Sequence, residues 1–225
     1  MQQGSRNLND GLGLIRTAEA ALNDVSGTFI RLRELASQAA NGTVGATEKQ
    51  TINLEYQNLL AEMDRISNST EFRDTTLLDG SLAKSASVHL VLQLGADSSS
   101  KNQIDLNNEL DLTQVSRAAF NLTDSNVTSQ GSAFLALNDL TSAIDTLISI
   151  RSRAGSTQIR LTSALNNLNT QIENLSGAVS TIRDANIAEE LALLTKNQIL
   201  VQAGAAMLAQ ANLIPQAVLT LFEGV

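Results

Sequence analysis

The side chains that could do chemistry are few and scattered. His89 is the only histidine, and the chain has no cysteine. A hydrolytic triad needs a histidine beside a placed nucleophile and acid, and a metal site needs several ligands at defined spacing. Neither pattern surrounds His89, which we expect to face solvent or an interface within a strand. The sequence therefore predicts no catalytic, metal or cofactor site.

The remaining chemical signals are also weak. The chain has no metalloprotease, dinucleotide-binding or phosphate-loop motif. The adjacent carboxylates Glu189 and Glu190 are typical of solvated helix surface. The N-glycosylation pattern Asn-x-Ser/Thr matches several times, as chance allows in a chain this rich in Asn, Ser and Thr. The matches include Asn41, Asn68, Asn121 and Asn126.

Composition narrows the class of protein. Hydrophobic residues make up 43% of the 225 residues, but aromatic residues only 3%, so we expect a core of Leu, Ile, Val and Ala. A net charge of −8 without a basic block argues against nucleic acid and against anionic membranes. No apolar run reaches the roughly 18 residues of a membrane span, so we expect no membrane insertion. The opening segment lacks the apolar core of a signal peptide.

The helices that would position any site are predicted from a seven-residue repeat of apolar side chains. The repeat is longest over residues 134–182, where two interleaved lines continue through a polar patch around Arg151 and Gln158. Such a stripe on one long helix is buried only against other long helices. The two lines are Leu140, Leu147, Ala154, Leu161, Leu168, Leu175 and Ile182, and Leu137, Ile144, Arg151, Gln158, Leu165, Ile172 and Val179.

Similar lines predict helices over about 5–40, 47–66 and 188–213. Asn41-Gly42 is expected to end the first helix through a left-handed residue, and a Thr47–Gln50 capping box to begin the second. Pro215 is expected to stop the last helix. The lines of the first helix are Leu8, Ile15, Leu22, Phe29 and Ala36, and Gly11, Ala18, Val25, Leu32 and Ala39.

Between these helices the period changes to two. Alternating apolar residues predict a β-hairpin region over about 75–112, with a turn at Asp79-Gly80. Residues 113–131 are polar and read as a connection, and residues 183–186 as a polar hinge. We therefore expect a mainly α fold: an elongated bundle of long antiparallel helices with a small β-hairpin region, plus a C-terminal amphipathic helix. The alternating residues are Val88, Leu90, Leu92 and Leu94, continued by Ile104 and Leu106.

Several motifs resemble those of bacterial flagellin. Residues 5–11 resemble the opening of its rod helix, and residues 31–41 (RLRELASQAAN) its most recognisable N-terminal motif. Residues 92–96 are similar to its hairpin strand. Residues 198–204 and 209–216 are close to its C-terminal pattern. The matches follow the family's order through nearly the whole chain.

The resemblance implies a structural subunit of the bacterial flagellar filament, which self-assembles through coiled-coil-like helices for motility. Residues 1–182 would form a rod-like helical domain, and residues 183–225 a C-terminal inner-tube helix. Flagellins carry a further N-terminal segment that pairs with this helix, and we expect this chain to lack it. The expected location is extracellular, in the flagellum, after export without a cleaved signal peptide.

The resemblance also implies contact residues. In the family, the positions that match Arg31, Leu35 and Glu55 form the patch gripped by the flagellin-sensing Toll-like receptor of hosts, and the same surface is buried between subunits. Arg31 and Leu35 lie off the apolar lines of their helix, so we expect both to be exposed. The last helix would contact other flagellin subunits or an export chaperone. Its contact residues would be Leu193, Leu200, Met207, Leu208 and Ile214.

Other functions are less well supported by the residues. The hook–filament junction protein shares both terminal patterns, but the motif at residues 31–41 favours flagellin. A flagellin-like surface module that binds polysaccharide would need aromatic platforms, which this chain almost lacks. Another alternative is a helical protein that inserts into membranes. Liposome co-sedimentation would distinguish it from flagellin. An enzyme is the least well supported of these functions.

Overall fold

The protein is mainly α-helical, which confirms the predicted fold class. The computed structural model describes residues 1–95, 97, 99–183 and 187–222, with side chains as far as residue 212. The chain divides into two compact units, Met1–Ile172 and Glu173–Val225. Of the predicted polar hinge, only Arg183 falls within the described residues.

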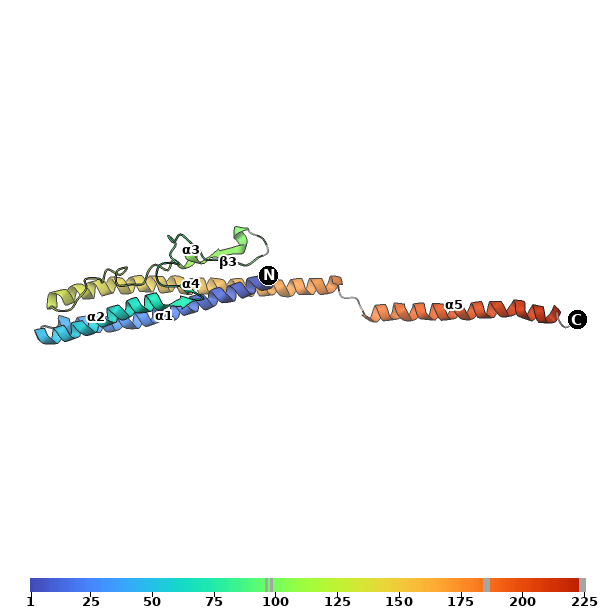
Figure 1. Ribbon diagram of the computed structural model, residues 1–225, viewed down its shortest axis with the longest axis horizontal. Coiled ribbons are helices and arrows are strands. Elements are labelled where there is room, and N and C mark those ends of the chain that lie inside the picture. The colour runs from blue at the N-terminus through green and yellow to red at the C-terminus, as the bar shows by residue number, and fades with distance from the viewer. Residues whose placement is uncertain (96, 98, 184–186, 223–225) are drawn as a thin grey trace. The chain divides into compact units, whose positions relative to one another are not determined.

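Long helices account for most of both units (Figure 1). Within the residues that the structure describes, four strands of two or three residues form two antiparallel pairs, β1 with β2 and β3 with β4. The helices are α1 (Gln2–Ala40), α2 (Ala46–Ser69), α3 (Leu106–Leu110), α4 (Gln130–Arg183) and α5 (Ile187–Phe222), with a 3-10 turn at Ser100–Asn102. The strands are β1 (Glu71–Phe72), β2 (Thr75–Thr76), β3 (Val91–Gln93) and β4 (Gln103–Asp105).

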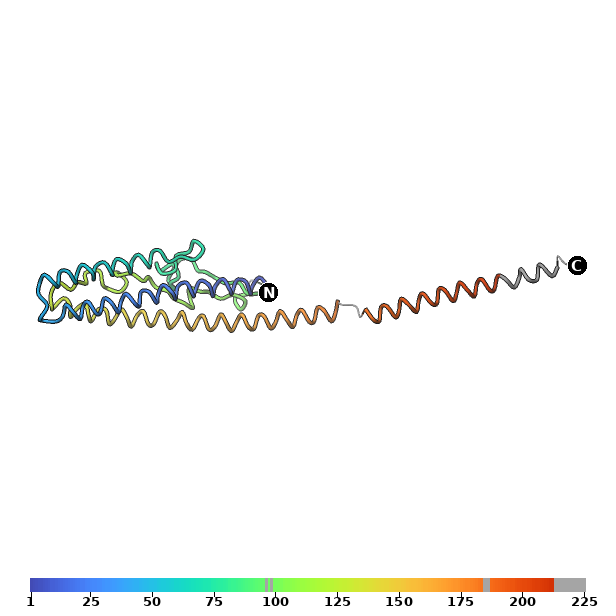
Figure 2. The backbone as a smooth tube through the Cα atoms, turned by 90° about the horizontal axis from the view of Figure 1, so that it is seen from below, coloured from blue at the N-terminus to red at the C-terminus, as the bar shows by residue number. Residues whose placement is uncertain are grey.

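In the first unit, α1 and α4 lie side by side and antiparallel, and α2 returns along α1 (Figures 1 and 2). Gln130 Nε2, at the start of α4, donates to the carbonyl oxygen of Ala40 at 3.0 Å. Near the other end of α1, Ser5 Oγ donates to Asn169 Oδ1 at 3.2 Å. Contacts at both ends therefore fix one register along the whole of α1.

The apolar lines predicted for the first helix form the core. All ten of their residues are buried, from Leu8 to Ala39. On α4 the first line is buried from Leu140 to Leu168, also as predicted. In the second unit Leu175 is 50% exposed and Ile182 is 87% exposed. The repeat predicts the helix correctly there, but burial also needs a neighbouring helix, and none of the described residues covers this stretch.

Two predicted helix boundaries around the first turn are wrong. Asn41 ends α1 with extended backbone (φ −69°, ψ 128°), because its N–H bonds to Gln38 O at 3.2 Å and the chain leads directly into α2. At the start of α2 the capping side chain is that of Glu48, whose Oε2 accepts a hydrogen bond from the Gly45 N–H at 2.6 Å. A carboxylate is the stronger acceptor at a helix N-terminus, so the helix begins before Thr47.

The predicted stop at Pro215 is also wrong, because α5 continues to Phe222. Proline removes one helix hydrogen bond and costs about 3 kcal/mol in a helix interior. The residues on both sides, including Ala211, Gln216 and Ala217, are good helix formers that continue the helix across it.

The β3–β4 pair confirms the predicted hairpin, with Leu92 opposite Ile104. The strand ends earlier than the alternation suggests, because Asp105 accepts hydrogen bonds from the Asn107 and Asn108 amides and begins α3. The β1–β2 pair has no counterpart in the predicted elements. Its turn residues Arg73 and Asp74 have φ of 50° and 63°, a conformation usually signalled by Asn or Gly.

Asn107 joins three segments of the first unit. Its side chain is fully buried. Its Oδ1 accepts from the Leu90 N–H at 2.8 Å, and its Nδ2 lies 3.0 to 3.3 Å from three carbonyl oxygens. One carboxamide therefore satisfies backbone groups that have no partner in a strand or helix. The three carbonyl groups belong to Ser81, Ala83 and Val88.

Residues 113–129 are not the purely polar connection that was predicted. Val115, Leu122 and Val127 are fully buried, and the ring of Phe120 meets that of Phe29 edge-on, with centroids 5.1 Å apart. These apolar residues stand singly among polar ones, so they show no period. The segment closes the core between α2 and α4.

Tyr56, the only tyrosine of the chain, also meets this segment. Its ring is fully buried, and its Oη lies 2.7 Å from Ser125 Oγ. Burial raises the pKa of Tyr56, and the hydrogen bond with Ser125 opposes that effect only in part.

Candidate functional site

The best-defined surface cluster, here called the ion-pair cluster, consists of Arg31, Glu34 and Glu55. Arg31 donates from Nε and Nη2 to Glu55 Oε1 at 2.9 and 2.6 Å, which ties α1 to α2. It also donates from Nη1 to Glu34 Oε2 at 3.0 Å. The hydrogen bond with Glu55, and then that with Glu34, raises the pKa of Arg31. About half of each side chain remains exposed, so a partner could reach all three.

Leu35 is only 2% exposed, so the predicted exposed position is wrong. Its heptad position is shared by Leu14 and Ala21, which are buried as well. α1 packs against α2, α4 and residues 113–129, so three neighbours bury a face wider than the two lines of a simple seam. The structure thus brings Arg31 and Glu55 together at the surface and places Leu35 beneath it.

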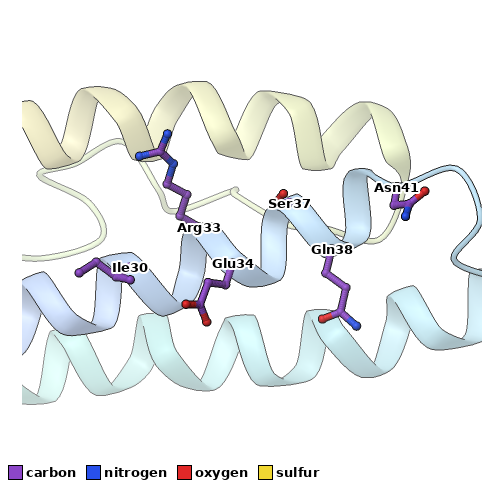
Figure 3. Close-up of a pocket in the computed structure, with 6 residues that line it drawn as sticks. All are labelled: Ile30, Arg33, Glu34, Ser37, Gln38 and Asn41. Carbon is purple, nitrogen blue, oxygen red and sulfur yellow. The ribbon is translucent and has the colours of Figure 1, made fainter.

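Beside the ion-pair cluster, the outer face of α1 forms a shallow open depression (Figure 3). Arg33 extends toward α4, whereas Glu34 and Gln38 extend toward α2. Ile30 is 59% exposed within it. This face offers apolar, charged and amide groups on an open surface, which suits a protein partner better than a small molecule. The depression is lined by Ile30, Arg33, Glu34, Ser37, Gln38 and Asn41.

The second candidate surface is the apolar face of α5, defined by six large side chains that recur at helical spacing. All six are more than half exposed, from 52% for Leu194 to 73% for Met207. Four of them are predicted contact residues, and the side chain of the fifth, Ile214, lies outside the described residues. The face consists of Leu193, Leu194, Leu200, Val201, Met207 and Leu208.

His89 lies next to an acid. Its Nδ1 is 2.6 Å from Asp105 Oδ2. The hydrogen bond with Asp105 raises the pKa of His89. Burial alone would raise the pKa of Asp105, but the hydrogen bonds from His89 and from the α3 amides outweigh it and lower that pKa. The pair links the residues before β3 to the end of β4, so its role is structural.

We expect the His89 pair to make the hairpin more stable in weak acid than at alkaline pH. The folded pKa of His89 lies above the ordinary value of 6.5. The stabilisation is therefore complete below the unfolded pKa and is lost as the pH rises through the folded pKa. NMR titration of the imidazole should show the raised pKa.

The matched variant is Asp105→Asn, which keeps an oxygen for the α3 amides but removes the charge. It should return the pKa of His89 toward its ordinary value. An unchanged pKa in this variant would show that Asp105 is not the cause.

Other site types find little support in the described part of the chain. No group of three or more His, Asp or Glu side chains there could hold a metal ion. The stretch between Gln130 and Asn212 is long and apolar enough to cross a membrane by length and composition alone. The core helix of a bundle meets the same criteria, and α4 is buried along one side.

Long helices packed through heptad seams, with exposed apolar and charged faces and shallow surface depressions, are typical of a helical structural protein that assembles with partners. Comparison with known proteins gives the family. The pattern of the bacterial flagellin N-terminal helical region matches residues 1–83, and that of the C-terminal helical region matches residues 137–222. The chain belongs to the bacterial flagellin family.

Individual relatives match most or nearly all of this chain. A flagellin of Halalkalibacterium halodurans is 38% identical over 99% of this chain and 79% of its own. The flagellar filament 33 kDa core protein of Treponema phagedenis is 33% identical over 99% of this chain and 80% of its own. The crystal structure of Bacillus cereus flagellin aligns with a TM-score of 0.60 at 30% identity, covering 77% of this chain and 94% of that one.

These relatives confirm the predicted function. The chain is a structural subunit of the bacterial flagellar filament, an extracellular assembly of flagellin subunits.

Proposed function

We propose that the α5 apolar face and the α1–α2 face around Arg31 and Glu55 form contacts between flagellin subunits. The observation that carries this proposal is the exposure of six large apolar side chains on one face of α5. Each Leu or Met buried by a partner contributes about 1.5–3 kcal/mol to association. The same face would be covered by an export chaperone before assembly.

Substitution Leu200→Glu with Met207→Glu should stop the chain from joining filaments. Loss of two buried apolar contacts predicts an incorporation at least about tenfold lower, since about 1.4 kcal/mol corresponds to a factor of ten. The measurement is incorporation of labelled chain onto sheared flagellin filaments, followed by electron microscopy.

Thr195→Glu with Gln202→Glu is the matched control, because it adds the same charge to the side of α5 opposite the apolar face. This control should incorporate like the parent chain. Equal incorporation by both double variants would remove the α5 apolar face from the proposal.

The ion-pair cluster is the proposed contact for the flagellin-sensing Toll-like receptor of hosts. Arg31 and Glu55 offer charged groups at the surface, and arginine is among the residues that dominate binding at protein interfaces. Leu35 enters this proposal as a buried core residue of α1, four residues after Arg31. It is not a direct contact in the free protein.

Arg31→Ala with Glu55→Ala should raise the concentration needed for half-maximal receptor signalling roughly tenfold or more, as expected when an interface loses a dominant arginine. The helix content should stay the same, because the pair is exposed. The readout is a reporter cell line that carries the receptor.

Asp10→Ala with Arg73→Ala removes a comparable exposed ion pair elsewhere on α1 and serves as the control. Potency that is unchanged by the Arg31 and Glu55 variant, or lowered as much by the control, would contradict the assignment.

Residues 183–225 act as the inner-tube helix and residues 1–182 as the rod domain. The protein leaves the cell without removal of a signal peptide, which the mass of the secreted chain would test. It carries out no catalysis, and its contribution to motility is mechanical.

A further inference from the structure

Asn41 and Gly42 form the only Asn-Gly pair in the sequence. Both residues are exposed in the short turn between α1 and α2. The backbone nitrogen that follows an asparagine can attack the side-chain carboxamide carbon. Glycine allows the closest approach because it has no Cβ to crowd that nitrogen.

One local hydrogen bond orients the Asn41 carboxamide. The Thr43 N–H donates to Asn41 Oδ1 at 3.1 Å, which folds the carboxamide over the Gly42 peptide. The same hydrogen bond polarises the carbonyl and would stabilise negative charge on Oδ1 when a nucleophile adds. Within the described part of the chain, no group accepts a hydrogen bond from the Gly42 N–H. Attack therefore breaks no existing hydrogen bond of that nitrogen.

We propose that Asn41 is a site of spontaneous deamidation through a succinimide. The Gly42 nitrogen loses its proton to hydroxide or buffer base and forms a bond to Asn41 Cγ. The Cγ–Nδ2 bond breaks, and ammonia leaves with a proton from solvent. Water then opens the five-membered ring at either carbonyl, which gives aspartate or isoaspartate. The net change consumes one water and releases one ammonia, so no oxidant, cofactor or enzyme is needed.

The product alters a surface that the fold exposes. Asn41 lines the depression on α1 that also contains Arg33 and Glu34 (Figure 3). Deamidation adds one negative charge there. The isoaspartate product also routes the main chain through an extra methylene between α1 and α2. The fraction of subunits that carry this added negative charge at position 41 therefore rises with the age of the protein.

The chain supplies its own comparison at Asn126. There the Thr128 N–H also donates to the asparagine Oδ1, at 3.4 Å. The next residue is Val127, whose branched side chain crowds the backbone nitrogen. The Val127 N–H is also held by Asn53 Oδ1 at 2.9 Å. Asn126 therefore has a similar carboxamide geometry but a hindered and engaged nucleophile.

The test incubates the folded full chain at mildly alkaline pH and follows peptide masses over time. Asn41 should convert roughly tenfold faster than Asn126, because only its nucleophile is unhindered. Isoaspartate-specific methylation should detect isoaspartate at position 41, since direct hydrolysis would give aspartate alone. Gly42→Ala should slow the conversion, and an added Cβ there meets only Gln130 Nε2 at an ordinary 3.7 Å.

Two results would overturn the proposal. One is conversion of Asn41 at the same rate as Asn126 in the folded chain. The other is conversion that occurs only after unfolding in denaturant, which would mean that the turn protects the pair. Because Asn41 and Asn126 are compared within one parent chain, the test does not depend on the folding of any variant.

Discussion

Phe29→Ala is expected to destabilise the first unit by about 3–5 kcal/mol, the usual cost of removing a fully buried phenylalanine. Phe29 is fully buried on α1, and its ring meets that of Phe120 at an interplanar angle of 84°. The substitution leaves a cavity where α1 meets residues 113–129 and removes an aromatic pair worth about 0.5–1.5 kcal/mol beyond its buried area. Such a loss is a large part of the roughly 5–15 kcal/mol that stabilises a typical domain.

Denaturant unfolding followed by far-UV circular dichroism measures this effect. Phe134→Ala is the control, because Phe134 is 53% exposed on α4 and should cost less than about 1 kcal/mol. If the two alanine variants lost the same stability, the Phe29–Phe120 contact would not be part of the core.

Asn107→Leu should cost about 3 kcal/mol or more, although leucine has the same number of side-chain heavy atoms and is apolar. The substitution leaves the Leu90 N–H and three buried or half-buried carbonyl groups without the partner that Asn107 provides. Each unsatisfied buried group costs about 1–3 kcal/mol, and water can reach some of them. We also expect faster hydrogen exchange at the Leu90 amide.

The neighbouring Asn108→Leu serves as the control because Asn108 is exposed and bonds only locally, to Asp105. Its expected cost is below about 1 kcal/mol. Retention of full stability by Asn107→Leu, with unchanged exchange at Leu90, would mean that the backbone groups find other partners.

The sequence was most informative where burial follows a period. The two apolar lines of α1 predicted ten buried residues correctly, because a long helix repeats its orientation every seven residues. The third buried position, which includes Leu14 and Leu35, could not be predicted this way. It is buried because segments distant in the sequence cover α1 on another side, as Phe72, Leu90 and Leu92 do around Leu14. Nothing in the sequence of α1 itself predicts those neighbours.

Interactions between residues that are far apart in the sequence could not be predicted from it either. The Asn107 hydrogen bonds and the Arg31–Glu55 pair join residues 17 to 26 positions apart. Arg31 and Glu55 entered as candidates through the family resemblance, and only the packing of α2 on α1 shows that they meet. The spacing of Asn41 and Gly42, by contrast, is visible in the sequence, but the Thr43 hydrogen bond that orients the carboxamide is not.

The buried phenol of Tyr56 provides a spectroscopic signal for the unfolding of the first unit. The chain has one tyrosine and no tryptophan, so its near-ultraviolet absorption comes chiefly from a single ring sealed in the core. Because the pKa of Tyr56 is raised above the ordinary value of 10.0 by burial, the unfolded chain ionises first as alkali is added. The appearance of tyrosinate absorbance in strong alkali would therefore mark the opening of the bundle, with no label attached.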